Sequence, residues 1–132
     1  MKINGLDHIA LRVPDPEATA QWYEKALGLR RYQHKKIWGP YPIMMLAGKS
    51  GLALFPATTD QPDSKHKGPG MFHFAFNVDL VELSKVQHQL EQFGLKVTFE
   101  DHHYFHSIYF SDPNGLIVEL TALTIEGSEF YD

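Results

Sequence analysis

The chain has 132 residues, with eight His, no Cys, and a net charge of −4 from 16 acidic residues against 12 Lys and Arg. This length fits one domain, or two very small units that share a core. The lack of Cys excludes disulfides, zinc fingers, thiolate nucleophiles and iron–sulfur sites, so a metal site would need imidazole and carboxylate ligands. The mild acidic excess and the lack of a long apolar run or signal-peptide pattern argue against nucleic-acid and membrane partners, and favour a cytoplasmic protein.

The first half of the chain is predicted to form one strand, one helix and three further strands. The helix is expected from Pro16 to Leu27, because Asp15 is a good N-cap and Pro suits the first helical position. Gly28 suits a C-terminal stop, since Gly adopts a left-handed conformation at no steric cost. The predicted strands are 4–13, 31–38, 42–47 and 51–56.

The second half is predicted to follow the same order. A helix is expected from Leu80 to Phe93, with Asp79 and Glu82 forming an Asp-x-x-Glu capping pattern and Gly94 ending it. Its apolar residues recur at spacings of three and four, the period of a helix with one buried face. The predicted strands are 71–78, 95–101, 105–112 and 115–123.

The two halves are related by an internal repeat. The segment 7–13 (DHIALRV) resembles 72–78 (FHFAFNV), and the Gly stop and final strand of each half keep the same order. The polar stretch 56–70 is rich in Pro and Gly and is predicted to link the halves. We therefore predict an α+β fold of two βαβββ modules, about 4–58 and 69–124; the tail beyond them has no clear pattern.

Three residues of metal-ligand type are predicted on sheet faces that point away from the helices. Alternate residues of a strand face opposite ways, so His8 and His73 lie opposite the apolar rows of their strands, at matching places in the repeat. Glu119 is the lone charge of a strongly apolar strand. One such residue is more often structural, but two His and one Glu form the facial set of non-haem iron sites, which leaves positions open for substrate.

The turn motif Asp112-Pro113-Asn114-Gly115 predicts the register of the last hairpin. Pro suits the first central position of a type I turn, and Gly suits the left-handed residue after it. In that turn Tyr109 lies opposite Glu119, and Ser107 lies opposite Thr121. Tyr109 and Ser107 then face the same side as the candidate ligand, whereas a two- or four-residue loop would reverse this.

The His-rich segment 101–106 (DHHYFH) has two interpretations. His106 has the wrong parity to face Glu119. His102 and His103 lie at a loop or strand start, where either residue is a candidate acid or base at the rim of a cleft. The alternative is that both are solvated loop residues.

Four segments together resemble the vicinal oxygen chelate superfamily, which includes glyoxalase I, extradiol dioxygenases, and fosfomycin and bleomycin resistance proteins. They are 7–13, 22–29, 73–76 and 107–120, and they extend over nearly the whole chain. The resemblance implies a single domain, 1–132, whose paired modules curl into a half-barrel around one divalent ion. The ligand positions implied by the family fall on His8, His73 and Glu119.

Departures from the family pattern bear on the reaction. Glyoxalase I usually has a fourth ligand, whose position falls here on the apolar Leu54 or Phe55. Extradiol dioxygenases use two His and one Glu on Fe(II) and a Tyr at the position of Tyr109, all of which are present. Their acid–base His would fall at Ser50 or Gly51, so it is missing: either His102 or His103 substitutes for it, or the chemistry differs.

The leading expectation is an extradiol-dioxygenase-like metalloenzyme, with Fe(II) favoured and Mn(II), Zn(II) or Ni(II) as alternatives. Tyr109 with His102 or His103 would be catalytic, and Ser107, Tyr109 and Phe55 would contact a small-molecule substrate. The alternatives are a glyoxalase-type lyase or isomerase, a fosfomycin-type thiol transferase, and a metal-free binding protein of the bleomycin resistance kind.

The assembly is expected to be a homodimer. Single-chain relatives of this length form two-fold dimers, and in many of them the modules pair across the dimer. The resemblance therefore implies sites near the interface, each built from His8 of one chain and His73 and Glu119 of the other. The length and polarity of the segment 56–70 are compatible with this exchange.

Overall fold

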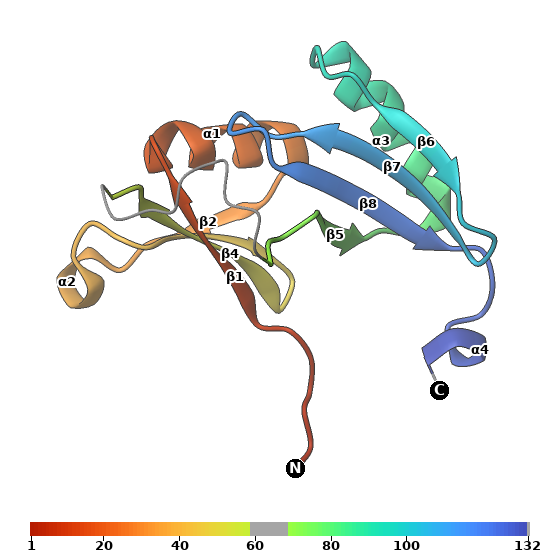
Figure 1. Cartoon of the computed structure of the whole chain (residues 1–132), viewed down its shortest axis with the longest axis horizontal. Coiled ribbons are helices and arrows are strands. Elements are labelled where there is room, and N and C mark those ends of the chain that lie inside the picture. The colour runs from red at the N-terminus through yellow and green to blue at the C-terminus, as the bar shows by residue number, and fades with distance from the viewer. Residues whose placement is uncertain (59–68, 132) are drawn as a thin grey trace. The chain divides into compact units, whose positions relative to one another are not determined.

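The computed structural model describes residues 1–58 and 69–131, except for the side chains of residues 128 and 129. The chain forms two compact units, Met1–Gly68 and Pro69–Asp132. Each unit holds one open four-stranded mixed sheet and one long helix packed on it (Figure 1). This confirms the predicted α+β class with two βαβββ modules. Of the predicted linker 56–70, residues 59–68 lie outside the described residues.

The first unit has the sheet order β1-β4-β3-β2, in which β1 and β4 are parallel and the other neighbours are antiparallel. Its long helix α1 packs against the sheet. The elements in chain order are β1 (His8–Val13), α1 (Pro16–Leu27), β2 (Arg30–Tyr32), α2 (Lys35–Trp38), β3 (Ile43–Ala47) and β4 (Ser50–Pro56).

Helix α1 has the predicted bounds because both ends are capped as expected. The Asp15 carboxylate accepts a hydrogen bond from the Ala18 backbone N–H at 3.0 Å. At the other end Gly28 takes a left-handed conformation with φ 66°, and its N–H donates to the Glu24 carbonyl at 3.0 Å.

The predicted strand 31–38 is wrong beyond Tyr32. Only three residues of β2 pair with β3, and Lys35–Trp38 form the one-turn helix α2 instead. His34 is its N-cap, with Nδ1 accepting from the Ile37 N–H at 3.3 Å. A local cap of this kind satisfies backbone donors that a strand would have paired with a neighbour.

The second unit has the order β5-β8-β7-β6, again with one parallel pair, β5 and β8. Helix α3 packs against β7 and β8. The predicted strands 71–78 and 95–101 begin later than expected. The elements are β5 (Phe74–Asn77), α3 (Leu80–Gln92), β6 (Thr98–Asp101), β7 (Phe105–Ser111), β8 (Ile117–Leu123) and α4 (Ser128–Tyr131), the last in a tail that had no sequence pattern.

The predicted capping pattern of α3 is only partly correct. Asp79 is the N-cap, but its side chain makes no capping hydrogen bond, and the Glu82 N–H donates to the Asp79 backbone carbonyl at 3.0 Å. The helix ends one residue early, at Gln92, and Gly94 follows with φ 97°. The Leu95 N–H closes this end on the Leu90 carbonyl at 3.1 Å.

Each sheet packs one face against its own helix, and the candidate ligand residues lie on the opposite face. The buried rows, with the helix residues that pack on them, are Leu11, Val13, Leu52 and Leu54 with Tyr23, and Phe74, Val118 and Leu120 with Leu83 and Leu90. By strand alternation the opposite faces carry His8 in the first unit, and His73 and Glu119 in the second. None of the described helices combines the length and apolar composition that a membrane span requires.

Candidate metal and acid–base site

A His–Glu pair lies on the helix-distal face of the second sheet. Glu119 is in β8, opposite Ala75 of the parallel strand β5, and His73 directly precedes β5. The His73 Nε2 and Glu119 Oε2 atoms are 2.9 Å apart. Glu119 is only 7% exposed. A carboxylate at that depth needs a partner, because burying an unpaired charge is costly, and His73 supplies it.

The pair leaves one polar atom unsatisfied. His73 Nδ1 is buried and has no hydrogen-bond partner among the described residues. With the proton on Nε2, the imidazole donates to Glu119 and the Nδ1 lone pair is left over. Buried polar atoms without partners are rare in folded proteins, and a bound water or ion is one of the arrangements that satisfies them.

Tyr109 lies beside this pair, as the turn motif predicted. The Asp112 N–H donates to the Leu116 carbonyl at 2.9 Å, and Gly115 is left-handed with φ 80°. The register confirms Tyr109 opposite Glu119. The Tyr109 and His73 rings pack edge to face, with centroids 5.8 Å apart.

The same register confirms the predicted place of Ser107 opposite Thr121. Their hydroxyl oxygens are 2.9 Å apart, and Ser107 is fully buried. A substrate contact through Ser107 stays a prediction. In this arrangement its hydroxyl fixes the strand pair next to Tyr109.

The surroundings of Tyr109 keep its phenol protonated. Burial raises the pKa of Tyr109, and the negative charge of Glu119 and a hydrogen bond to that carboxylate raise it further. A weaker hydrogen bond from Ser107 acts in the opposite direction. At neutral pH the group therefore presents an O–H donor.

The structure distinguishes between His102 and His103. His102 Nε2 is 2.8 Å from Tyr109 Oη and 3.4 Å from Glu100 Oε2, so it is the His that meets the tyrosine. His103 instead shapes the loop: its φ is 71°, and the Tyr104 N–H closes a three-residue turn on the His102 carbonyl at 2.9 Å. Any catalytic role of either residue stays a prediction.

Sequence reasoning missed Glu100 and placed His106 correctly. Glu100 lies opposite Ser107, on the Tyr109 face of the sheet, and the alternation Thr98–Glu100 in the predicted strand 95–101 was the available signal. His106 lies opposite Ala122 and packs against Phe99 with ring centroids 5.3 Å apart. His106 is therefore on the other face, as its parity predicted.

In the first unit, the Nδ1 atom of His8 has a polar partner, which the Nδ1 atom of His73 lacks among the described residues. The His8 Nδ1 atom is 2.7 Å from the Asp7 carboxylate. A carboxylate that accepts from Nδ1 fixes the imidazole tautomer and leaves the Nε2 lone pair free, as second-sphere carboxylates do for metal-binding His. Phe55, predicted to contact substrate, is 36% exposed and borders a hollow of about 410 Å³ with Ala10 and Arg12.

The counterpart of Glu119 in the first unit is Ala53, and the predicted alternatives, Leu54 and Phe55, are both wrong. Ala10 pairs with Ala53, as its repeat partner Ala75 pairs with Glu119. The offset differs because the β3–β4 turn has two residues (48–49), whereas the β7–β8 turn has three (113–115). The position is apolar, as expected.

The donor set fits a divalent ion in part. Two adjacent ligands of an octahedral ion, each about 2.1 Å from it, lie about 3 Å apart, close to the spacing of His73 Nε2 and Glu119 Oε2. With a metal ion on Nε2, the imidazole proton would lie on Nδ1 instead. Neither unit by itself brings three His, Asp or Glu side chains of the described residues close enough to hold a metal ion. The third ligand, His8, is in the other unit, so its convergence on the pair stays a prediction.

Comparisons with known proteins address the family directly. The model of the Glyoxalase/Bleomycin resistance protein/Dioxygenase superfamily matches residues 5–120. None of the curated proteins is significantly similar in sequence. An integron cassette protein from the mobile metagenome of V. cholerae is 27% identical, with a TM-score of 0.70 over 92% of this chain and 97% of that one.

Two further solved structures are similar at lower identity. A lactoylglutathione lyase from Agrobacterium tumefaciens is 21% identical, with a TM-score of 0.73 over all of both chains. The fosfomycin resistance protein FosX from Mesorhizobium loti is 22% identical, with a TM-score of 0.64 over 94% of this chain and 96% of that one. These two matches establish a shared fold and no more. The family model, in contrast, matches most of this chain, and it shows that the chain belongs to the Glyoxalase/Bleomycin resistance protein/Dioxygenase superfamily.

Proposed function

We propose that the chain is a divalent-metal-dependent enzyme that acts on two neighbouring oxygen atoms of a small substrate, in the manner of an extradiol ring-cleaving dioxygenase. One observation carries the proposal. His73, Glu119, Tyr109 and His102 form a continuous series of contacts on one face of the second sheet. This series joins a candidate ligand pair to a candidate proton carrier through a protonated phenol.

The ligand roles fall to His73 and Glu119, with His8 as the third ligand. Two imidazoles and one carboxylate are the donor set of non-haem Fe(II) oxygenases, so Fe(II) is the favoured ion. A bound divalent ion supplies a Lewis acid that stabilises negative charge on the substrate oxygens. Asp7 would orient His8 from behind, through the 2.7 Å contact with its Nδ1.

Proton handling falls to Tyr109 and His102. The raised pKa of Tyr109 keeps its phenol protonated, and its O–H, which here donates to Glu119, would turn to a substrate oxygen to donate there. His102 Nε2, 2.8 Å from the phenol, is placed to accept the proton that a substrate hydroxyl releases and to return it to the product. Glu100, 3.4 Å from the same nitrogen, helps to orient the ring.

The lack of a fourth ligand in the first module favours this reaction over a glyoxalase-type isomerisation. A fourth ligand from that module would come from the counterpart of Glu119, which is Ala53. A methyl group has no donor atom. Three protein ligands leave more coordination positions on the metal than four do, and a substrate that binds through two oxygens needs two of them.

A reconstitution assay tests the proposal. Protein purified without oxygen and loaded with Fe(II) should consume a catechol with equimolar oxygen uptake, and the chelator-treated protein should not. The same preparations are offered the hemithioacetal of methylglyoxal and a thiol, and fosfomycin with and without a thiol. If the protein turns over only the hemithioacetal or only fosfomycin, the proposed oxygenase is replaced by a lyase or a transferase. If it binds no stoichiometric metal, the metal-free binding protein is the remaining function.

We further propose a homodimer in which each site takes His8 from one chain and His73 and Glu119 from the other. Mixing His8→Ala and Glu119→Ala chains and refolding them should then restore about one quarter of all sites, since half of the dimers are mixed and one site in each is intact. Metal content and oxygen uptake measure the recovery. Mixing His73→Ala with Glu119→Ala is the matched control, because every mixed site keeps one defect. Equal inactivity of both mixtures would contradict the exchange.

A further inference from the structure

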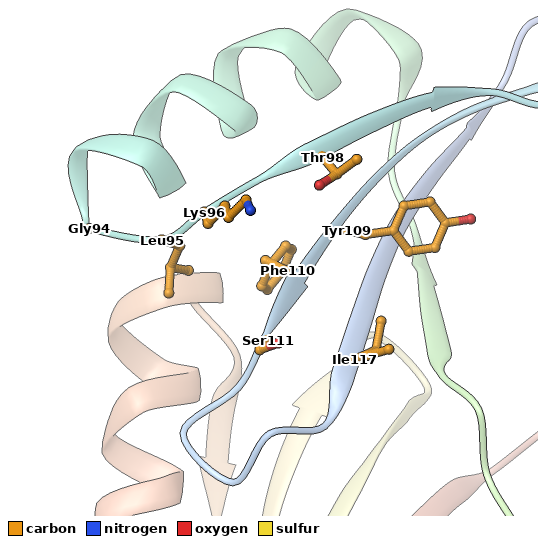
Figure 2. Close-up of a pocket in the computed structure, with 8 residues that line it drawn as sticks. All are labelled: Gly94, Leu95, Lys96, Thr98, Tyr109, Phe110, Ser111 and Ile117. Carbon is orange, nitrogen blue, oxygen red and sulfur yellow. The ribbon is translucent and has the colours of Figure 1, made fainter.

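A hollow of about 400 Å³ lies at one end of the second sheet, next to the proposed site (Figure 2). Tyr109 forms part of its wall, so a molecule in the hollow is in reach of the tyrosine. The volume is in the range of small-ligand pockets. The lining residues are Gly94, Leu95, Lys96, Thr98, Tyr109, Phe110, Ser111 and Ile117.

The lining combines one positive charge with an apolar middle. Lys96 is the only charged residue among the described residues that line the hollow, and the hydroxyls of Thr98 and Ser111 add neutral polar groups. Leu95, Phe110 and Ile117 supply the apolar surface. A pocket of this composition suits a compact apolar body that carries an anionic group.

The lysine is available for an incoming anion. Among the residues that the structure describes, the Lys96 side chain has no hydrogen-bond or ion-pair partner. None of the described residues that line the hollow carries a carboxylate. On a chain of net charge −4, an anion gains from a local positive charge that no acidic neighbour neutralises.

The register gives the reach between the two ends of the hollow. Thr98 of β6 lies opposite Tyr109 of β7, and Lys96 precedes Thr98 by two residues. Neighbouring strands are about 5 Å apart and two extended residues span at most about 6.6 Å, so the Tyr109 and Lys96 backbones are within about 8 Å of each other. Both residues are therefore near enough for a molecule the size of one aromatic ring with a short side arm to lie beside both.

We propose that the hollow is the subsite for a carboxylate arm of the substrate, which Lys96 binds while the two reacting oxygens lie beside Tyr109. The position of the reacting oxygens beside Tyr109 rests on the proposed function, and the carboxylate subsite deepens that function. The substrate class becomes a vicinal diol or catechol that bears a short carboxylate arm. Lys96 is then a specificity-determining residue.

The first experiment tests the subsite without the reaction. Phenylacetate and its neutral amide are titrated into the full-length metal-free protein, followed by NMR shifts of the residues that line the hollow. Lys96→Met should weaken phenylacetate binding about fivefold and leave the amide unchanged, whereas Lys96→Arg should retain binding. Lys85→Met, at an exposed position of α3, is the matched control and should bind like the unaltered protein.

Two results would overturn the subsite: phenylacetate binding no tighter than the amide, or equal binding by the Lys96→Met and unaltered proteins. The Fe(II)-loaded protein gives the second test. The ratio of kcat/KM for 3,4-dihydroxyphenylacetate over 4-methylcatechol should fall about fivefold in Lys96→Met. Turnover with an unchanged ratio refutes the subsite and keeps the proposed function. Lys96-dependent phenylacetate binding without turnover of any catechol refutes the function and keeps the subsite.

Discussion

Replacing Glu119 by Gln, or His73 by Ala, is expected to abolish stoichiometric metal binding. The Gln variant keeps the size of the buried side chain and a hydrogen-bonding oxygen for His73, but it loses the negative charge that makes a strong ligand. Loss of a ligand should weaken metal affinity by more than about 100-fold, since even second-sphere changes cost about 10–100-fold. Metal content after dialysis and the affinity for Fe(II) or a substitute ion measure the effect.

The matched control is Glu100→Gln, the same substitution on the same sheet face. Glu100 is exposed and contacts His102 rather than His73, so this variant should keep its metal. Far-UV circular dichroism and Tm show whether each variant is folded. Folded Glu119→Gln protein with full metal content would mean that the metal site lies elsewhere.

Local signals account for what the sequence predicted of the fold. Asp15 and Gly28 mark the ends of α1 because capping is decided by a few neighbouring residues. The turn at 112–115 fixes the register of the whole β7–β8 hairpin, and with it the contact of Tyr109 and Glu119.

The errors arose where a local cap was overlooked or where a single residue of loop length decides the outcome. Lys35–Trp38 carry no apolar alternation that would support a strand, and the His34 side chain caps them as a one-turn helix. The two hairpins differ by one residue in their turns, which moved the counterpart of Glu119 to Ala53.

Part of the candidate site could be predicted from local patterns, and part could not. Strand alternation and hairpin register were enough to place His73, Glu119 and Tyr109 on one face. Selecting His102 over His103 needed the left-handed turn at His103, which no neighbouring Gly or Asn signals. Recruitment of His8 depends on how two units and two chains assemble, and local patterns do not encode that.

The acid–base assignment predicts the second large effect. Tyr109→Phe and His102→Gln should each lower kcat by about 100- to 10,000-fold, the usual worth of a positioned proton carrier. Phe lacks the hydroxyl that His102 Nε2 contacts at 2.8 Å, and Gln keeps a polar contact but cannot take up or release a proton near neutral pH. Metal content should stay unchanged in both, because neither residue is a proposed ligand.

The double variant and one control decide whether the two groups act together. If His102 works through Tyr109, the Tyr109→Phe and His102→Gln double variant should be no slower than the worse single variant, since groups that act as a unit are not additive. His103→Asn is the control: Asn tolerates the left-handed backbone at φ 71°, so the loop keeps its shape and kcat should stay near that of the unaltered enzyme. A large loss in His103→Asn with a normal rate in His102→Gln would transfer the acid–base role to His103. Multiplicative losses in the double variant would show that Tyr109 and His102 serve separate steps.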